Sequence, residues 1–189
     1  VAPMKLDKKI KRENWIVTVA SLTYPKGIEY LIEVAKAVLK QNKKWKWLIL
    51  GEGEEREKLE NAIKENGLEK QLLLKGCVKN VEWYLNRAKL FVLTSRREGL
   101  PLCLIEAMQM KVPCVSFNIK TGPSDIIADN INGILIPAFE IKEMIWEVNY
   151  LLSNQNRLEK LSENTKIHLE QFQRGIIVKK WEEIFQRVE

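Results

Sequence analysis

The chain of 189 residues lacks the residue patterns that several classes of enzyme require. It has no Asp-x-Asp pair to hold a divalent ion on a diphosphate, and its one histidine, His168, lies in a late segment where a surface role is expected. Metal catalysis is therefore not predicted, and no metal site or cofactor is expected. Neither a Walker A loop nor a nucleophile elbow is present, which leaves kinase and hydrolase chemistry without their defining parts.

Long apolar runs and paired cysteines are missing as well. Without a signal peptide or a run of about twenty apolar residues, the sequence predicts neither a membrane span nor export. Cys77, Cys103 and Cys114 form an odd set with no paired spacing, and each lies beside apolar residues in an expected element. They are interpreted as reduced thiols of the core. The expected location is cytoplasmic, and a place at the inner face of a membrane stays open.

Negative charge is in deficit, with 25 Asp and Glu against 31 Lys and Arg and a net charge of +6. A basic surface suits phosphate ligands, acidic membranes or nucleic acid without choosing among them, and no nucleic acid partner is expected. Residues 43–47 interleave lysines with tryptophans, a mixture found at lipid interfaces. The same residues lead directly into a strand, so a strand entry at the surface is the favoured interpretation and peripheral membrane contact is the alternative.

Short apolar runs alternate with segments of helical period over most of the chain. Strands are predicted at residues 16–20, 47–50, 72–75, 90–93, 112–117 and 133–136. Helices are predicted at 28–41, 54–66, 81–87, from 102 onward and at 124–129. Apolar strands separated by helices specify a parallel sheet covered on both faces. The predicted fold class is therefore α/β, a Rossmann-like six-stranded parallel sheet with a helical C-terminal tail.

The length fits one domain with a single core. Residues 1–14 are polar and basic without apolar periodicity, and we interpret them as a linker or a trimmed domain boundary. Residues 15–152 are expected to form the Rossmann-like domain. Residues 153–189 are expected to form C-terminal helices.

The most informative stretch is residues 95–110, where a strand leads into a glycine turn and a helix leads out. Glu98 and Glu106 lie eight positions apart around the turn at 99–101. Such a turn aims unpaired backbone N–H groups and the positive end of the helix dipole at its mouth, which suits an anion such as phosphate. With one acid in front of the helix and one on it, each can face one end of an extended ligand.

This stretch resembles the signature of the retaining glycosyltransferases with the GT-B fold, in particular the glycosyltransferases group 1 family, CAZy family four. The signature has two glutamates separated by seven residues, as Glu98 and Glu106 are here, in similar flanking sequence. Further segments similar to the family occur in order, at 17–35, 47–60 and 121–137. The resemblance covers about residues 17–152 and implies the C-terminal, donor-binding half of a GT-B fold. It thereby implies that the domain at residues 15–152 binds a nucleotide sugar.

The resemblance implies roles for individual residues. Lys26, in the loop after the first strand, pairs with the diphosphate of the donor, and Glu98 lies near the transferred sugar, which makes these two the implied catalytic residues. Glu106 accepts hydrogen bonds from the ribose hydroxyls. The phosphates are held by the backbone N–H groups of Gly99, Leu100 and Leu102.

Three further positions are implied near the nucleotide. Ser21 stands where family members commonly carry an arginine, so it offers a hydrogen bond but no charge, and Arg96 or Arg97 is a candidate to compensate. Gly53 lies in a glycine turn after the second strand, which is the wrong strand for a nicotinamide cofactor, and supports the nucleotide. Val78 follows the third strand, in a segment whose backbone often meets the base.

The resemblance implies an enzyme of polysaccharide biosynthesis, a metal-independent hexosyltransferase that uses a UDP- or GDP-sugar and retains the anomeric configuration. The acceptor, a glycan or a lipid, is expected on an N-terminal domain outside these 189 residues, so the chain alone is expected to transfer little or nothing. The last helices either pack across that domain through Trp181, Ile184 and Phe185 or pack on their own sheet. Two alternatives stay open: a nucleotide-sugar epimerase of the same fold, and a non-catalytic module that binds a membrane or a partner.

Overall fold

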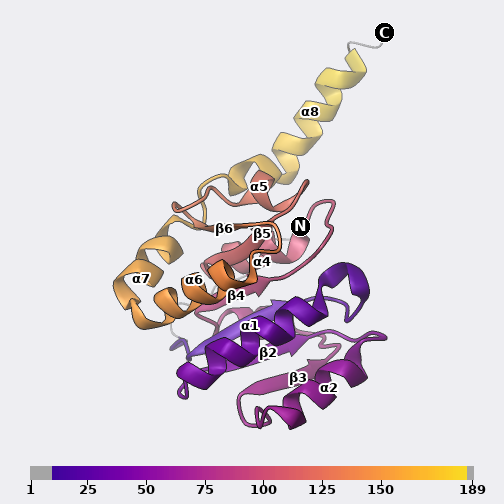
Figure 1. The fold of residues 1–189 in the computed structure, drawn as a ribbon. Coiled ribbons are helices and arrows are strands. Elements are labelled where there is room, and N and C mark those ends of the chain that lie inside the picture. The colour runs from indigo at the N-terminus through magenta and orange to yellow at the C-terminus, as the bar shows by residue number, and fades with distance from the viewer. Residues whose placement is uncertain (1–9, 187–189) are drawn as a thin grey trace.

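The computed structural model describes residues 10–186, drawn in Figure 1, and most of the predicted N-terminal linker, residues 1–9, lies outside the described residues. The strands of the central sheet are β1 (Trp15–Val19), β2 (Lys46–Leu50), β3 (Leu72–Gly76), β4 (Leu90–Leu93), β5 (Cys114–Asn118) and β6 (Gly133–Pro137). The α-helices are α1 (Ile28–Gln41), α2 (Arg56–Glu65), α3 (Val81–Leu85), α4 (Leu102–Gln109), α5 (Pro123–Ile126), α6 (Ile141–Ser153), α7 (Gln155–Asn164) and α8 (Arg174–Gln186). Two short 3-10 helices join them, η1 (Tyr24–Lys26) and η2 (Leu169–Phe172).

The six strands are all parallel and follow the order β3-β2-β1-β4-β5-β6. The predicted Rossmann-like sheet is thereby confirmed. The first three strands build toward one edge of the sheet and the last three toward the other, so the strand order reverses between β1 and β4. In open parallel sheets this reversal opens a crevice beyond the carboxyl ends of the strands, where ligands bind.

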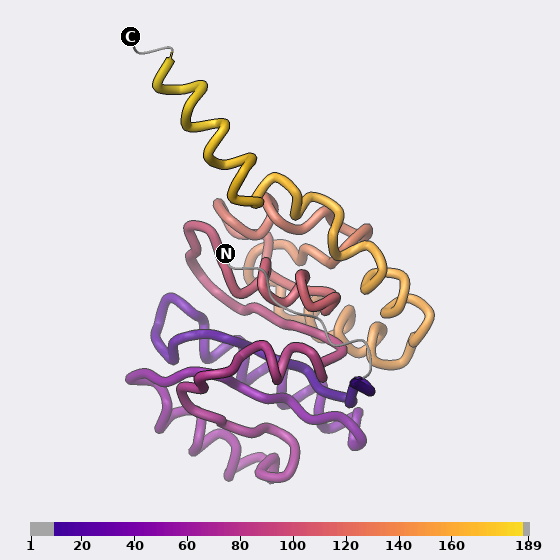
Figure 2. The backbone as a smooth tube through the Cα atoms, turned by 180° about the vertical axis from the view of Figure 1, so that it is seen from behind, coloured from indigo at the N-terminus to yellow at the C-terminus, as the bar shows by residue number. Residues whose placement is uncertain are grey.

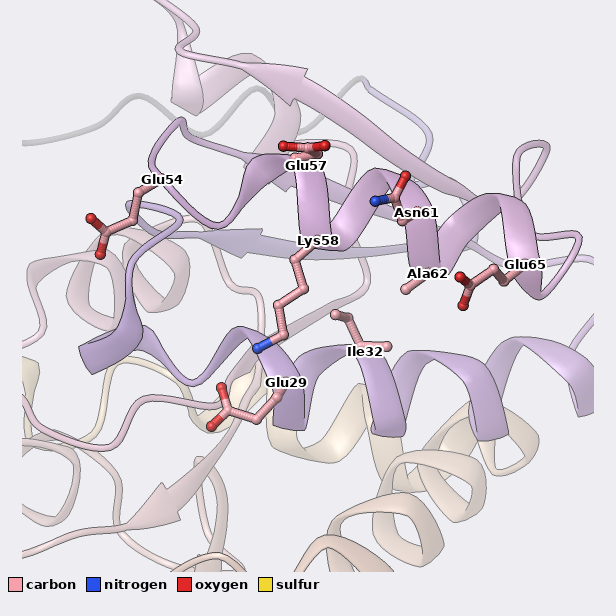
Figure 3. Close-up of a pocket in the computed structure, with 8 residues that line it drawn as sticks. All are labelled: Glu29, Ile32, Glu54, Glu57, Lys58, Asn61, Ala62 and Glu65. Atoms are coloured by element: carbon pink, nitrogen blue, oxygen red, sulfur yellow. The ribbon is translucent and has the colours of Figure 1, made fainter.

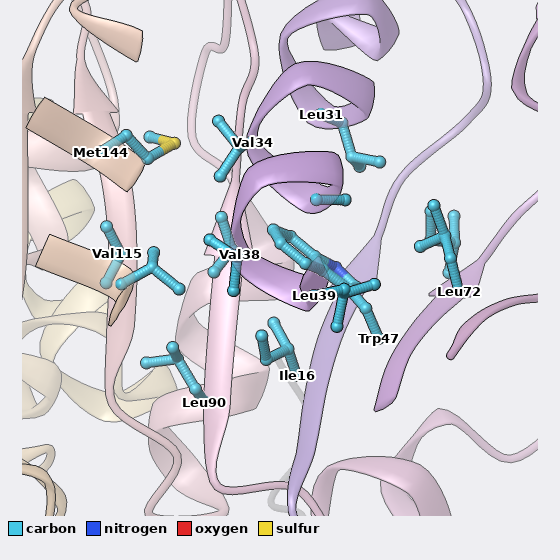
Figure 4. Packing of buried hydrophobic residues seen from close by; sticks show 14 of the residues in the cluster. Ile16, Leu31, Val34, Val38, Leu39, Trp47, Leu72, Leu90, Val115 and Met144 are labelled. Carbon is cyan, nitrogen blue, oxygen red and sulfur yellow. The ribbon is translucent and has the colours of Figure 1, made fainter. Parts of the chain in front are cut away.

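Apolar side chains on both faces of the sheet hold the helices in two layers. Successive residues of a strand point to opposite faces, so Ile16 packs on one side and Val17 on the other. One core cluster joins the sheet to α1, α2, α6 and α7, and Figure 4 shows part of it around Trp47. The second cluster joins the opposite face to α3, α4 and α5. Helices therefore cover both faces, as Figures 1 and 2 show from opposite sides.

Most predicted element bounds agree closely with the structure, and the differences have local causes. The predicted ranges 28–41 and 90–93 are those of α1 and β4. α2 begins at Arg56 rather than at residue 54, because Glu55 donates its N–H to the carbonyl of Leu22 at 2.9 Å and belongs to the preceding turn. β5 begins at Cys114 rather than at residue 112, because Pro113 has no N–H to donate to a neighbouring strand.

The three cysteines differ in exposure. Cys114 is buried and Cys103 is partly buried, but Cys77 is exposed in the turn that follows β3. The interpretation of all three as core thiols is therefore wrong for Cys77. Its flanking residues are apolar only on one side, which is typical of a strand end rather than of a strand centre.

The tryptophans of residues 43–47 face the core. Trp45 is 7% exposed, and Trp47 is fully buried with its indole N–H donating to Thr18 Oγ1 at 3.0 Å. These indoles are therefore unavailable to a lipid interface, and the strand entry is the correct interpretation of the segment. Across residues 10–186, every helix is too short or too polar to span a bilayer.

The helix α8 extends away from the sheet, as Figures 1 and 2 both show. None of its residues is buried. Its exposed large apolar side chains are Ile176, Ile177, Val178, Trp181, Ile184 and Phe185. The rings of Trp181 and Phe185 stack with centroids 5.8 Å apart. The alternative in which this helix packs on its own sheet is therefore wrong.

Candidate functional site

The loop after β1 is held against the loop after β4 around Gly27. This glycine has a φ of 63°, and a Cβ at this position would lie 2.2 Å from the carbonyl oxygen of Thr94. Thr94 Oγ1 donates to the carbonyls of Lys26 and Gly27 at 3.3 and 3.2 Å. The N–H of Arg96 donates to the carbonyl of Pro25 at 2.8 Å. The missing side chain at residue 27 thus lets the two loops meet where the strand order reverses.

Lys26 and Glu98 form an ion pair across this junction. Lys26 Nζ lies 2.7 Å from Glu98 Oε1, although 72 positions separate the two residues. Ser95 Oγ donates to the same oxygen at 2.6 Å. The side chain of Glu98 is 8% exposed and that of Lys26 is 25% exposed, so the ammonium group lies on the solvent side of the pair. Sequence reasoning missed the roles of Thr94 and Ser95, and their place directly after a buried strand was the available signal.

The turn at residues 99–101 leads into α4, which begins at Leu102. No side chain caps this helix, and its first turn carries no acid. Within the described residues, no protein group accepts the N–H groups of Gly99, Leu100 or Leu102. Leu100 and Leu102 are 43% and 50% exposed, so a ligand can reach this turn. Free amides with a helix dipole behind them favour an anion at this position.

The charges of Glu98, Lys26 and Glu106 all act on the thiol of Cys103. Burial raises the pKa of this thiol to about 12, the Glu98 carboxylate adds to the shift, Lys26 acts against it and Glu106 adds to it again. Glu106 is partly buried on α4, and the loss of solvent raises the pKa of its carboxyl group.

The loop after β5 holds the other side of the turn. Thr121 Oγ1 donates to the backbone carbonyl of Glu98 at 2.6 Å. Gly122 has a φ of 97°, and a Cβ there would lie 2.7 Å from both the carbonyl oxygen of Gly99 and Cδ of Pro101. The turn is therefore fixed from two sides, by the loops after β1 and β5, and this sets the direction of its amides.

The remaining predicted residues lie farther along the same edge of the sheet. Ser21 is exposed in the loop after β1. Gly53 lies in the loop after β2 and packs against the β1 loop. A Cβ at this position would lie 2.3 Å from a carbonyl oxygen of that loop. Val78 follows β3 and is partly buried against the second core cluster. In the described part of the chain, no hydrogen bond or ion pair joins these three residues to Lys26 or Glu98.

Arg96 does not take the place of the arginine that is missing from the β1 loop. Its guanidinium packs between the rings of Tyr24 and Tyr30, with Cζ 4.4 Å from each centroid. It also donates to the hydroxyl of Tyr30 at 2.7 Å and pairs with Glu29. Arg96 is thus committed to the start of α1, and the suggestion that it compensates at the phosphates is wrong.

A cavity of about 620 Å³ between α1 and α2 does not belong to this site. Figure 3 shows its lining, in which Lys58 reaches toward Glu29. The lining also includes the further glutamates Glu54, Glu57 and Glu65. Several carboxylates around one hollow repel a diphosphate, so we do not assign this cavity to a nucleotide.

The three thiols are expected to react with iodoacetamide at very different rates. Cys77 is exposed. The pKa of Cys103 is raised from 9.0 to about 12, so at neutral pH this thiol forms on the order of a thousandfold less thiolate than a thiol with a pKa of 9.0. Mass spectrometry of peptides after brief alkylation at pH 7.5 should find the label on Cys77 alone. A Cys77→Ser variant should then take up almost none. Comparable labelling of Cys103 in the folded chain would contradict the burial that raises the pKa of its thiol.

The parallel sheet, with helices on both faces and a reversal of strand order between β1 and β4, defines the chain as an α/β domain of the Rossmann type. Its particular family follows from comparison with known proteins. The model of the family "Glycosyl transferases group 1" matches residues 5–168. The chain belongs to this family, and its fold is one Rossmann-like half of the GT-B architecture.

Two curated relatives illustrate the likeness. The chain is 35% identical over 179 residues to a poly(ribitol-phosphate) alpha-N-acetylglucosaminyltransferase of Staphylococcus aureus. The aligned region covers 94% of this chain and 36% of that protein. It is 31% identical to the amylovoran biosynthesis glycosyltransferase AmsD of Erwinia amylovora, over 92% of this chain and 48% of that protein. The chain thus spans between a third and a half of the length of these relatives.

Solved structures agree with this assignment. A crystal structure of a S. aureus TarM mutant in complex with fondaparinux, alpha-GlcNAc-glycerol and UDP superposes with a TM-score of 0.91 at 34% identity. The superposition covers 98% of this chain and 38% of that one.

Proposed function

We propose that the chain is the donor-binding domain of a retaining glycosyltransferase that moves a hexosyl group from a nucleotide diphosphate sugar to an acceptor. The observation that carries the proposal is the Lys26–Glu98 pair, 2.7 Å apart, beside the free amides of the turn at 99–101. A cation and a set of N–H groups that converge beside two carboxylates can bind a diphosphate at one end and hydroxyl groups at the other.

The same groups supply a mechanism for transfer. As the bond to the sugar breaks, negative charge develops on the departing diphosphate and positive charge develops on the sugar. Lys26, the turn amides and the dipole of α4 stabilise the diphosphate, and they are in place before the reaction because both flanking loops fix the turn. Glu106 accepts from the ribose hydroxyls, and Glu98 lies on the side of the sugar. We keep Ser21, Gly53 and Val78 as nucleotide contacts in this proposal.

The acceptor, a glycan or a lipid-linked chain, binds in our proposal on another domain of a longer protein, across a cleft from this site. The longer length of the relatives supports this. The exposed apolar side chains of α8 supply a surface for contact with such a domain. The relatives named above are transferases and give no support to an epimerase or a non-catalytic module. Metal independence and a cytoplasmic location stay predictions.

Calorimetry of the 189-residue chain against UDP, GDP and ADP tests the proposal directly. We expect weak binding of at least one of the three and no transfer, because the proposed acceptor site lies elsewhere. Heat of binding indistinguishable from dilution for all three nucleotides at millimolar concentration would refute the donor site. In a longer form of the protein, a new glycoside after incubation with the donor supports transfer, whereas an isomerised donor would show epimerisation.

A further inference from the structure

A basic hollow lies at the end of the sheet opposite Lys26 and Glu98, where β1 and β2 begin. Its volume is about 540 Å³, and its lining consists of Lys11, Arg12, Glu13, Asn14, Trp15, Lys44, Lys46 and Lys89. Five of these eight residues are cations and one is an acid. The register of the sheet creates this cluster, because Trp15 of β1 stands opposite Lys46 of β2. We call it the basic cavity.

Two cations of the basic cavity bind backbone and amide oxygens rather than carboxylates. Arg12 donates to the carbonyls of Ala88 and Met110 at 2.6 and 2.5 Å, and Lys89 Nζ donates to Asn14 Oδ1 at 2.8 Å. Among the described residues, none of the five cations takes part in an ion pair with Asp or Glu. Burial lowers the pKa of Arg12, and an anion nearby would favour its charged form.

A neighbouring hollow extends the basic cavity along α7. This hollow of about 430 Å³ shares Arg12 and Lys89 with the basic cavity. Its other lining residues are Gln155, Leu158, Glu159, Ser162 and Glu163. Amide, hydroxyl and carboxylate groups can bind the hydroxyl groups of a ligand, and Arg12 and Lys89 beside them can bind its negative charges. The hollow therefore suits a ligand in which hydroxyl-bearing units alternate with negative charges.

We propose that the basic cavity binds a polyol chain linked by phosphodiester groups, with the phosphates on the cations and the hydroxyls toward α7. The proposal deepens the proposed function and rests on it, since such a chain would be an acceptor held at a second point, away from the donor site. The two points lie at opposite ends of the strands. A long polymer can reach both ends, whereas a short acceptor cannot.

Two other polyanions fit the basic cavity less well. No residue that lines it is among the exposed large apolar side chains, and Trp45 beneath Lys89 is buried, so no side chain is placed to enter a lipid layer. Single-stranded nucleic acid is bound through aromatic rings on which bases stack, and the one ring in the lining, Trp15, is partly buried and packs against Trp83. The concave shape also suits a chain better than a flat membrane.

The test is fluorescence anisotropy of the chain with a labelled glycerol-phosphate oligomer of about ten units. We expect affinity that falls steeply with salt and that drops on the order of tenfold in a Lys44→Glu/Lys46→Glu variant, as contacts to phosphates are removed. The matched control is Lys179→Glu/Lys180→Glu on α8, which changes the net charge by the same amount and should bind as the unchanged chain does. Thermal melting of both variants checks that each is folded, and Lys44→Gln/Lys46→Gln provides a milder form of the first.

Each other outcome counts against the proposal. An equal loss in the two charge-reversed variants would mean non-specific attraction to a basic protein. Binding to phosphatidylglycerol vesicles, or to an oligonucleotide, with no binding of the glycerol-phosphate oligomer would assign the basic cavity to another partner. Because Lys26 lies at the other end of the sheet, Lys26→Ala should leave oligomer binding unchanged. Failure of the donor site and failure of the basic cavity are therefore separate results.

Discussion

Alanine in place of Lys26 is expected to weaken the binding of the preferred nucleoside diphosphate by about 10- to 100-fold. The replacement removes a charge-assisted contact to the diphosphate. It also leaves Glu98, which is 8% exposed, without the cation that neutralises it at 2.7 Å. An unpaired carboxylate beside the phosphates repels them, which moves the expected loss toward the upper end of this range. Calorimetry with the nucleotide that binds the unchanged chain best gives the measurement.

Three further variants separate this effect from a general loss of charge. Lys26→Arg keeps the cation and should retain part of the affinity. Glu98→Gln removes the repulsion and should bind the diphosphate at least as well as the unchanged chain. Lys58→Ala removes one positive charge from the cavity between α1 and α2 and should leave the nucleotide affinity unchanged. If Lys26→Ala binds like Lys58→Ala, the lysine does not contact the diphosphate and the proposed mechanism fails.

The second large effect is expected on the free energy of unfolding when a glycine is replaced by alanine. Two glycines with the same φ can be compared. Gly27 and Gly67 both have a φ of 63°, but a Cβ on Gly67 meets nothing within 4 Å, whereas one on Gly27 lies 2.2 Å from the carbonyl oxygen of Thr94. Gly67→Ala should therefore cost only the left-handed conformation, about 1 to 2 kcal/mol. Gly27→Ala should cost roughly 4 kcal/mol or more, because the clash adds to the same strain.

Urea unfolding of the two alanine variants measures the difference in the free energy of unfolding. Gly27→Ala should also weaken nucleotide binding, since the clash separates the loop that carries Lys26 from the loop that carries Glu98. Gly67→Ala should bind normally, because α2 ends far from both loops. Equal free energies of unfolding for the two variants would show that the close approach at residue 27 does not hold the loops together.

The parts of this fold that depend on local sequence were predictable. Apolar periodicity located α1 and β4 without error, and the alternation of strands and helices indicated the parallel sheet, because each element carries its own pattern of burial. The glycine turn before α4 was predictable for the same reason, since a strand, a glycine turn and a helix follow one another within 95–110. Glu98 and Glu106 belong to that one stretch.

Pairings between distant segments were not predictable from periodicity. The ion pair between Lys26 and Glu98 depends on the contact of two loops that are 72 positions apart. Arg96 looked like a free loop cation, but the aromatic rings of Tyr24 and Tyr30 enclose it. The basic cavity likewise brings together residues 11–15, two lysines near β2 and Lys89, which only the register of the sheet places side by side.

The helix α8 contacts η2 and has no buried residue. Since none of its side chains is buried, truncating Trp181 or Phe185 removes no core contact and leaves no void in the sheet domain. Substitutions at these two positions should therefore change the melting temperature of the chain little. Substitutions of the six exposed large apolar residues of α8 are therefore expected to affect association with a partner rather than folding of the sheet domain.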